Sequence, residues 1–197
     1  MRLWRGLKPP ATSGYTLQVA TAPKHPVDRR ITLLERLFRA VILDRTLYEE
    51  VAADRTGLSQ AFGVVILAGI VNGMTLTAIP GSIGALFGIF VSVVGWLALS
   101  GLTLAVGNWA LRTEPTSWRV VGTCLGFADT PSLLNILGVA QSIGMFVRII
   151  VWFWLLAATA VAASAAFRVS LARGAAIGGL GFGAYMLIGL AVGIWST

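Results

Sequence analysis

The chain has 197 residues, of which 56% are hydrophobic and only 12% are charged, and its formal net charge is +7. Soluble globular domains carry about 25% charged residues, so the composition excludes an ordinary water-soluble domain and indicates a membrane protein. The length fits one domain. Ten of the 15 Lys and Arg residues precede Leu58, and the others lie at or near the ends of apolar segments. This distribution argues against nucleic-acid binding and favours contact with an anionic cytoplasmic membrane surface.

Residues 1–30 form a polar, basic tail that is broken by prolines. No continuous apolar run of about 7–15 residues follows its positive start, so it lacks the pattern of a secretory signal. We expect the tail to be flexible unless a partner binds it. The single histidine, His25, lies in this tail, and the single cysteine, Cys124, lies in an apolar stretch. We therefore expect no metal site, no cofactor and no internal disulfide.

Residues 31–56 predict two short amphipathic helices. The apolar positions on one face of the first helix are Leu34, Leu37, Phe38 and Val41. Thr32 and Glu35 have the spacing of a capping box, and Thr46 and Glu49 repeat it, which indicates a second helix start. Such helices lie either on the membrane surface or under a bundle. Both a partner-binding role and a purely connecting role are open for them.

Residues 57–197 contain five apolar runs, each long enough to cross a hydrocarbon core of about 30 Å. The runs are about 60–79, 83–111, 118–140, 145–167 and 175–195. Pro80 and Gly81 predict a tight turn between the first two. The fold class is therefore an all-α membrane protein: a five-transmembrane-helix bundle, preceded by short amphipathic helices and a basic N-terminal tail.

The Lys and Arg residues between the runs predict the orientation. With five spans and a cytoplasmic N-terminus, 14 of the 15 basic residues lie on the cytoplasmic side, as the positive-inside rule requires. Omitting the third span, the least apolar one, would place Arg168 and Arg173 outside. We therefore predict five spans and an external C-terminus.

The third run contains the most unusual residues of the chain. Asp129 lies near its middle, where a carboxylate costs several kcal/mol unless it is neutral, hydrated or paired. Pro131 cannot donate a backbone hydrogen bond, so we expect a kink near Phe127–Asp129 and carbonyl groups that need other partners. Asn135 adds a second polar side chain to the same span.

Two interpretations of Asp129 are open. It could line a proton or cation pathway together with Asn135, Asn72 and Asn108. The favoured interpretation is a buried carboxylate that accepts hydrogen bonds; the candidate donors in other spans are Asn72, Thr75 and Asn108. Arg148 is expected about four residues closer to the outer face, from where its side chain extends outward rather than pairing with Asp129.

Four pairs of glycines have the small-xxx-small spacing that permits close helix contact. They are Gly69 with Gly73, Gly84 with Gly88, Gly179 with Gly183, and Gly189 with Gly193. We favour Gly189 and Gly193, which lie beside Trp195, as a packing face, either within one chain or between chains.

Parts of the chain resemble a known family. The stretches LDRTLYEEVAADRTGLSQAFGVVILAGIVNGM and GFADTPSLLNIL, a tryptophan in the fourth span, and Arg168 and Arg173 before the last span resemble prokaryotic members of the Yip domain family. The resemblance covers roughly residues 35–195. Its most specific element is an aromatic-Ala-x-x-Pro motif formed by Phe127, Ala128 and Pro131, in which phenylalanine replaces the family's usual tyrosine.

The resemblance implies a small five-helix protein of a prokaryotic inner membrane with a cytoplasmic N-terminus. Eukaryotic members of the family act in vesicle trafficking and contact Rab-type GTPases through their cytoplasmic part. Residues 1–58 contain no GTPase-binding motif, so that activity does not transfer to this chain.

The sequence predicts no enzyme, because no nucleophile stands with a base and no glycine loop leads to a P-loop lysine. The leading hypothesis is a membrane scaffold or interaction protein that docks through its cytoplasmic N-terminal region. A narrower form is an accessory or assembly subunit of a larger membrane complex. The expected partners are membrane lipids and other membrane proteins or identical copies. The alternative is a small channel or transporter that uses Asp129 and the polar Asn residues.

Overall fold

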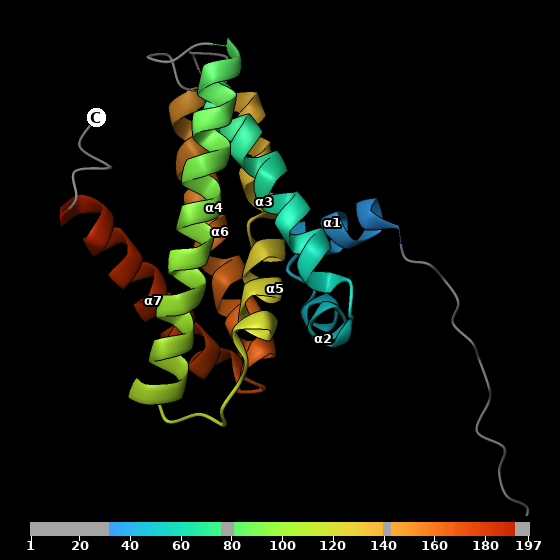
Figure 1. Cartoon of the computed structure of the whole chain (residues 1–197), viewed down its shortest axis with the longest axis vertical. Coiled ribbons are helices and arrows are strands. Elements are labelled where there is room, and N and C mark those ends of the chain that lie inside the picture. The colour runs from blue at the N-terminus through green and yellow to red at the C-terminus, as the bar shows by residue number, and fades with distance from the viewer. Residues whose placement is uncertain (1–31, 76–80, 140–142, 192–197) are drawn as a thin grey trace, which may run out of the picture. The chain divides into compact units, whose positions relative to one another are not determined.

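The computed structural model describes residues 32–75, 81–139 and 143–191, which fold into helices joined by short connections (Figure 1). The described residues belong to one unit, Ile31–Thr197. The elements are α1 (Leu33–Val41), α2 (Arg45–Ala53), α3 (Gly57–Met74), α4 (Gly81–Ala105), the π-helical η1 (Val106–Ala110), α5 (Trp118–Ala128), the 3-10 helix η2 (Thr130–Val139), α6 (Gly144–Ala166) and α7 (Leu171–Ala191). The all-α fold class is confirmed.

Five segments of the described chain are long and apolar enough to cross a membrane, so the chain is a multi-pass membrane protein. They are Gly57–Met74, Gly81–Trp109, Trp118–Gly138, Gly144–Ala166 and Leu171–Ile188. These are the five predicted spans. The third consists of two elements, α5 and η2, whereas the second is one long helix with a π-helical end.

The predicted starts of the first and last spans are late by a few residues. Helix α3 begins at Gly57 rather than at Gln60, and α7 begins at Leu171 rather than at Ala175. Helical hydrogen bonding extends into polar residues that a search for apolar runs leaves out, since the Gln60 N–H already bonds to the carbonyl of Thr56. Residues 76–80 and 192–197 lie outside the described part, so the turn predicted at Pro80 and the end of the last run stay predictions.

Helices α3 and α4 approach each other closely along two glycine pairs. A Cβ on Gly88 would lie 2.5 Å from the Cα of Gly73 and still closer to the carbonyl oxygen of Gly69. A Cβ on Gly73 would collide with the carbonyl of Gly84 in the same way. Two of the predicted small-xxx-small pairs therefore interlock, and they join α3 to α4.

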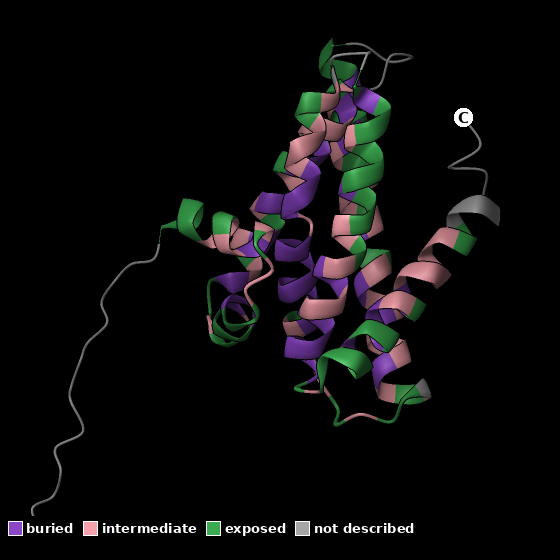
Figure 2. Ribbon diagram, turned by 180° about the vertical axis from the view of Figure 1, so that it is seen from behind, coloured by how far each residue is buried: buried purple, intermediate pink, exposed green. Residues whose placement is uncertain are grey.

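Helix α5 is the centre of the bundle. Every residue from Val121 to Ala128 is buried, and Figure 2 shows this helix as the most continuously buried one. The Trp96 indole of α4 donates a hydrogen bond of 2.9 Å to the carbonyl of Gly122. One turn further along α5, Gly126 packs directly on Ala61 of α3. The least apolar predicted span is thus the one that its neighbours cover most completely.

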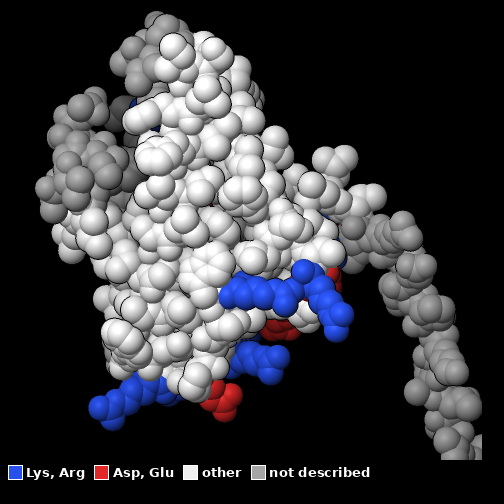
Figure 3. All heavy atoms as spheres, in the orientation of Figure 1, with Lys and Arg blue, Asp and Glu red and all other residues white. Residues whose placement is uncertain are grey.

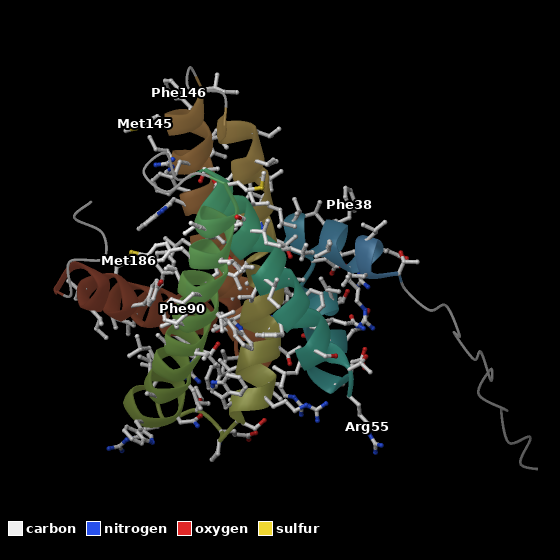
Figure 4. The ribbon with its side chains drawn as sticks, turned by 45° about the horizontal axis from the view of Figure 1, so that its top comes forward. Phe38, Arg55, Phe90, Met145, Phe146 and Met186 are labelled. Atoms are coloured by element: carbon white, nitrogen blue, oxygen red, sulfur yellow. The ribbon has the colours of Figure 1, made fainter. Side chains whose placement is uncertain are left out.

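The charged side chains mark one end of the bundle. Most of those visible in Figure 3 gather where α2 and the α4–α5 connection lie, and the rest of the visible described surface is almost entirely uncharged. Arg55, labelled in Figure 4, lies at this end. Met145 and Phe146, at the start of α6, lie at the opposite end of the bundle. We call these the charged end and the uncharged end.

Helices α1 and α2 pack beside the spans differently from each other. Leu47, Tyr48 and Val51 of α2 are completely buried against the bundle. Helix α1 turns its apolar side outward: Leu34 is 77% exposed and Phe38 is 65% exposed, and Figure 4 shows Phe38 pointing away from the bundle. An amphipathic helix with this orientation places its apolar side chains against lipid.

The capping residues of these two helices are partly as predicted. The Thr32 hydroxyl accepts a hydrogen bond from the backbone N–H of Glu35 and caps α1. The second helix start is confirmed, but its N-cap is Asp44 and not Thr46, which lies inside α2. The Asp44 carboxylate reaches both the backbone N–H and the hydroxyl of Thr46, so it is a stronger cap than the hydroxyl.

Candidate functional site

The third span changes helix type at Asp129. Helix α5 ends at Ala128, Asp129 is its C-cap, and the 3-10 helix η2 begins at Thr130. The kink expected near Phe127–Asp129 is therefore a change from α-helix to 3-10 helix. Pro131 is the cause, because it has no N–H to continue the α-helical hydrogen bonds.

The carbonyl that Pro131 leaves without its α-helical partner is that of Phe127. The Thr130 hydroxyl donates a hydrogen bond of 2.6 Å to this oxygen. Thr130 is 2% exposed and the Phe127 ring is completely buried, so this hydroxyl partner lies inside the protein and not in water. The aromatic residue of the predicted motif packs in the core.

Asp129 accepts its shortest hydrogen bond from its own span. The Ser132 hydroxyl donates to the Asp129 carboxylate at 2.5 Å, and the Ser132 N–H bonds to the Asp129 carbonyl at 2.9 Å. The carboxylate also acts electrostatically on the Tyr185 phenol of α7. The donors predicted for it, Asn72, Thr75 and Asn108, are thus replaced by a serine three residues away.

Asn72 and Asn135 pair with each other. The Asn135 amide donates a hydrogen bond of 2.9 Å to the side-chain oxygen of Asn72, which joins η2 to α3. Thr75 caps the end of α3, where its hydroxyl donates to the carbonyl of Asn72 at 2.7 Å. This amide pair is a second polar contact of the third span. It occupies amide groups that would be needed to line a path for protons or cations.

Asn108 lies in a different part of the molecule. Its side chain exchanges two hydrogen bonds of 3.4 Å with the backbone of Thr116, and it thereby fixes the connection between η1 and α5 at the charged end. The prediction that Asn108 shares a site with Asp129 is wrong. Assigning a residue to a span does not determine the depth of its side chain in the membrane.

Arg148 is exposed on α6, one turn from the end at Gly144. Within the described residues, its guanidinium makes no ion pair or hydrogen bond, which agrees with the prediction that it does not pair with Asp129. It is thus separate from the polar contacts of the third span.

The glycine pair that we favour as a packing face, Gly189 and Gly193, lies at the C-terminal end of the last span. Gly193 and the side of α7 at Gly189 lie outside the described residues, so that pair stays a prediction. A Cβ on Gly179 or Gly183 would meet nothing within 4 Å. Close glycine contacts occur between α3 and α4, and α7 makes others through Gly174 and Gly178, which face α6, and through Gly181, which faces Thr103 of α4.

A second polar cluster, which the sequence did not predict, holds α1 and α2 together. We call residues 33–54 the N-terminal platform. The Arg39 guanidinium forms ion pairs with Asp44 at 2.7 Å and Glu50 at 2.8 Å, and Arg36 forms one with Asp54 at 2.8 Å. The Arg36 guanidinium also donates a hydrogen bond of 2.7 Å to the side-chain oxygen of Gln60. These basic side chains therefore join α1 to α2 and to the start of α3.

Hydrogen bonds also attach the platform to distant spans. The Trp154 indole of α6 donates to the carbonyl of Val41 at 2.8 Å. The Arg119 guanidinium of α5 donates to the carbonyls of Asp54 and Arg55, and the Arg45 side chain reaches the carbonyl of Val169. Contacts with three separate elements hold the platform in one position on the bundle.

Two carboxylates of the platform, Asp44 and Asp54, are stabilised in their charged form. The backbone N–H of Thr56 lowers the pKa of Asp54 from its ordinary value, and the Arg36 side chain lowers it further. The Thr46 hydroxyl is the largest cause that lowers the pKa of Asp44. The ion pairs of Asp44 with Arg39 and of Asp54 with Arg36 therefore persist to lower pH than the ordinary pKa of an aspartate would allow.

The chain was also compared with other proteins. Neither protein-family models, nor curated proteins, nor solved structures give a match. Among the described residues, no group of three or more His, Cys, Asp and Glu side chains could hold a metal ion.

The functional residues that sequence reasoning missed are Ser132, Thr130, Arg36 and Arg39. A hydroxyl on each side of Pro131 was a usable signal, because serine and threonine commonly bond to nearby backbone and side-chain groups. Arg36 and Arg39 are three residues apart and share a helix face. Their partners, however, depend on the turn after α1, which no local pattern predicts.

Proposed function

We propose that this chain is a non-enzymatic membrane scaffold that binds other membrane proteins, or a second copy of itself, through the N-terminal platform. The attachment of the platform to three other elements supports this proposal most. A simple connection between tail and bundle needs no fixed position, whereas a docking surface does. A position fixed in advance lowers the entropy lost on binding.

The exposed surface of the platform has the composition of a docking site. Its outward apolar side chains are Leu34, Phe38 and Ile42, which are 77%, 65% and 56% exposed. Glu35 is an exposed charge beside them. This combination fits a partner that is itself embedded in the membrane, because lipid and a partner helix offer similar apolar surroundings.

The polar contacts of the third span support a structural role rather than transport. Asp129 bonds to Ser132, and Asn135 bonds to Asn72. In both contacts the polar groups bond to each other, so they are not left to line a path. The remaining candidate, Asn108, bonds to the α4–α5 connection. We also propose, on the resemblance and the charge distribution, a Yip-type protein of a prokaryotic inner membrane, with a cytoplasmic N-terminus and an external C-terminus.

Capture from native membranes tests the docking role. The full chain is extracted in mild detergent after cross-linking, and co-purifying chains are quantified by mass spectrometry. We expect Glu35→Arg together with Phe38→Glu to reduce the captured partner at least tenfold. Glu114→Arg, an exposed charge reversal on the α4–α5 connection, is the matched control and should change nothing. A chain that purifies alone, or equal capture by all variants, contradicts the proposal.

A flux measurement distinguishes the alternative function. The parent chain and Asp129→Asn are reconstituted in liposomes, and proton and cation flux are recorded. The scaffold proposal expects no flux above that of empty liposomes for either chain. Flux in the parent that disappears in Asp129→Asn would make the chain a transporter.

A further inference from the structure

Helix α6 carries two apolar grooves on its outer surface. The first has a volume of about 380 Å³ and is lined by Leu43, Ile149, Ile150, Phe153, Trp154 and Ala157. The second has a volume of about 340 Å³ and is lined by Met145, Arg148, Ile149, Trp152 and Phe153. Ile149 and Phe153 belong to both, and residues four apart stack on one helix face. They therefore form a ridge with one groove on each side.

Arg148 is the one charged side chain among the described residues that line the two grooves. It is exposed, and no described residue forms an ion pair or hydrogen bond with its guanidinium. The described carboxylates other than Asp129 lie on the platform and the α4–α5 connection, at the charged end, and Asp129 itself bonds to Ser132. A guanidinium beside apolar surface needs an anion or water as its partner.

The two grooves together extend along α6 for about the depth of one leaflet of a bilayer. Arg148, in the second groove, and Ala157, in the first, are nine residues apart on α6, which corresponds to about 13.5 Å at a rise of about 1.5 Å per residue. Half of a hydrocarbon core of about 30 Å is about 15 Å. A cation therefore stands near one end of an apolar surface that is about as deep as one leaflet, and Met145 marks that end in Figure 4.

We propose that this surface of α6 is a binding site for one diacyl phospholipid with a net negative headgroup. The Arg148 guanidinium donates hydrogen bonds to the phosphate oxygens. One acyl chain lies in each groove, with the Ile149–Phe153 ridge between them. The lipid belongs to the leaflet at the uncharged end of the bundle.

The surroundings of Arg148 favour an anionic headgroup over a zwitterionic one. The ammonium of phosphatidylethanolamine would lie close to the guanidinium, and no described carboxylate at this end could accept it. The hydroxyl groups of phosphatidylglycerol avoid this repulsion and leave the phosphate charge uncompensated. Leu43, from the turn between α1 and α2, lines the first groove, so the bound lipid also contacts the N-terminal platform.

Native mass spectrometry of the full chain in mild detergent tests the site. The probes are dipalmitoyl phosphatidylglycerol and dipalmitoyl phosphatidylethanolamine, added separately at equal concentrations. We expect one phosphatidylglycerol to remain bound at activation energies that remove phosphatidylethanolamine. Arg148→Gln should weaken phosphatidylglycerol binding about fivefold, the effect of one basic side chain at an anionic lipid surface, and Arg148→Lys should retain most of it.

Two further variants separate the site from general attraction. Arg173→Gln removes an exposed cation from α7 at the charged end and should leave binding unchanged. Ala157→Phe fills the deep end of the first groove. It should therefore weaken the binding of the dipalmitoyl lipid, but not the binding of a phosphatidylglycerol with eight-carbon chains. Gel filtration and thermal unfolding verify that each variant is folded.

Three results would overturn the proposal. One is equal binding of phosphatidylglycerol by the parent chain and Arg148→Gln. Another is an equal loss in Arg148→Gln and Arg173→Gln, which would mean unspecific attraction. The third is a dimer whose interface covers α6 and which added phosphatidylglycerol does not dissociate.

Discussion

The close contact of α3 with α4 gives a sharp prediction for a single methyl group. In Gly88→Ala the new Cβ would lie 2.5 Å from the Cα of Gly73, and the carbonyl of Gly69 would be nearer still. Non-bonded heavy atoms are optimally about 3.5–4.0 Å apart. Both neighbours are backbone atoms, which cannot rotate away as a side chain can. The two helices must therefore separate by roughly 1 Å or more along this face.

Gly101→Ala is the matched control, because it is the same substitution in the same helix. A Cβ on Gly101 would meet nothing within 4 Å. There the methyl group acts only through helix propensity, which favours alanine over glycine by about 1 kcal/mol. Overpacking of a close-packed site typically costs about 1–3 kcal/mol, and a clash with two backbone atoms belongs at the upper end of this range. The cost at Gly88 therefore exceeds the same propensity gain, and the two variants should change stability in opposite directions.

Thermal unfolding in detergent, followed by circular dichroism, measures the difference. A change of 1 kcal/mol shifts the midpoint of a chain of this size by about 2–4 °C. We expect Gly88→Ala to unfold several degrees below the parent chain, and Gly101→Ala to unfold at or above it. Equal midpoints for the two variants would refute the close packing of α3 on α4.

Three other predictions concern hydrogen bonds and ion pairs. Thr130→Val removes the donor to the Phe127 carbonyl and should cost about 1 kcal/mol in chemical unfolding, whereas Thr130→Ser should cost little; equal losses would contradict the role of the hydroxyl. Trp154→Phe should speed amide hydrogen exchange of α1, because it loses the bond to Val41, and Trp152→Phe, which retains that bond, should not. The pKa of Asp54 is lowered in the folded chain, so its stabilisation is complete above the unfolded pKa of about 3.9 and is lost as the pH falls through the lower folded value. Thermal midpoints measured from pH 6 to pH 2 should therefore drop less steeply for Asp54→Asn than for the parent chain, and parallel curves would exclude this contribution.

The positions of the spans follow from sequence because lipid imposes a simple rule. A helix must carry about twenty apolar residues to cross, and the basic residues between such runs restrict the orientation. Even the third span, with Asp129 and Pro131 inside it, is recognised by this reasoning. The break in the helix of this span is also predictable, because Pro131 has no N–H to donate to the carbonyl of the residue four positions before it.

The partners of the polar groups could not be predicted in the same way. Asn135 bonds to Asn72 across 63 positions in the sequence, and such a contact depends on the rotation of two helices about their axes. The partner of Asp129, by contrast, is Ser132, only three residues away, and a contact at that separation can be predicted from the local sequence. The glycine pairs show the same limit: four pairs have equal spacing, and only the packing distinguishes Gly69 and Gly88 from Gly179.

The 3-10 helix η2 also determines which side of the third span meets lipid. With three residues per turn, Ser132, Asn135 and Gly138 stand in a single column, while Ile136 and Leu137 are 42% and 56% exposed. In an α-helix the same three positions would fan out over about 120°. Deleting one residue between Ser132 and Asn135 would rotate the Asn135 side chain by a third of a turn about the helix axis. The carboxamide would then point away from α3 and toward the acyl chains.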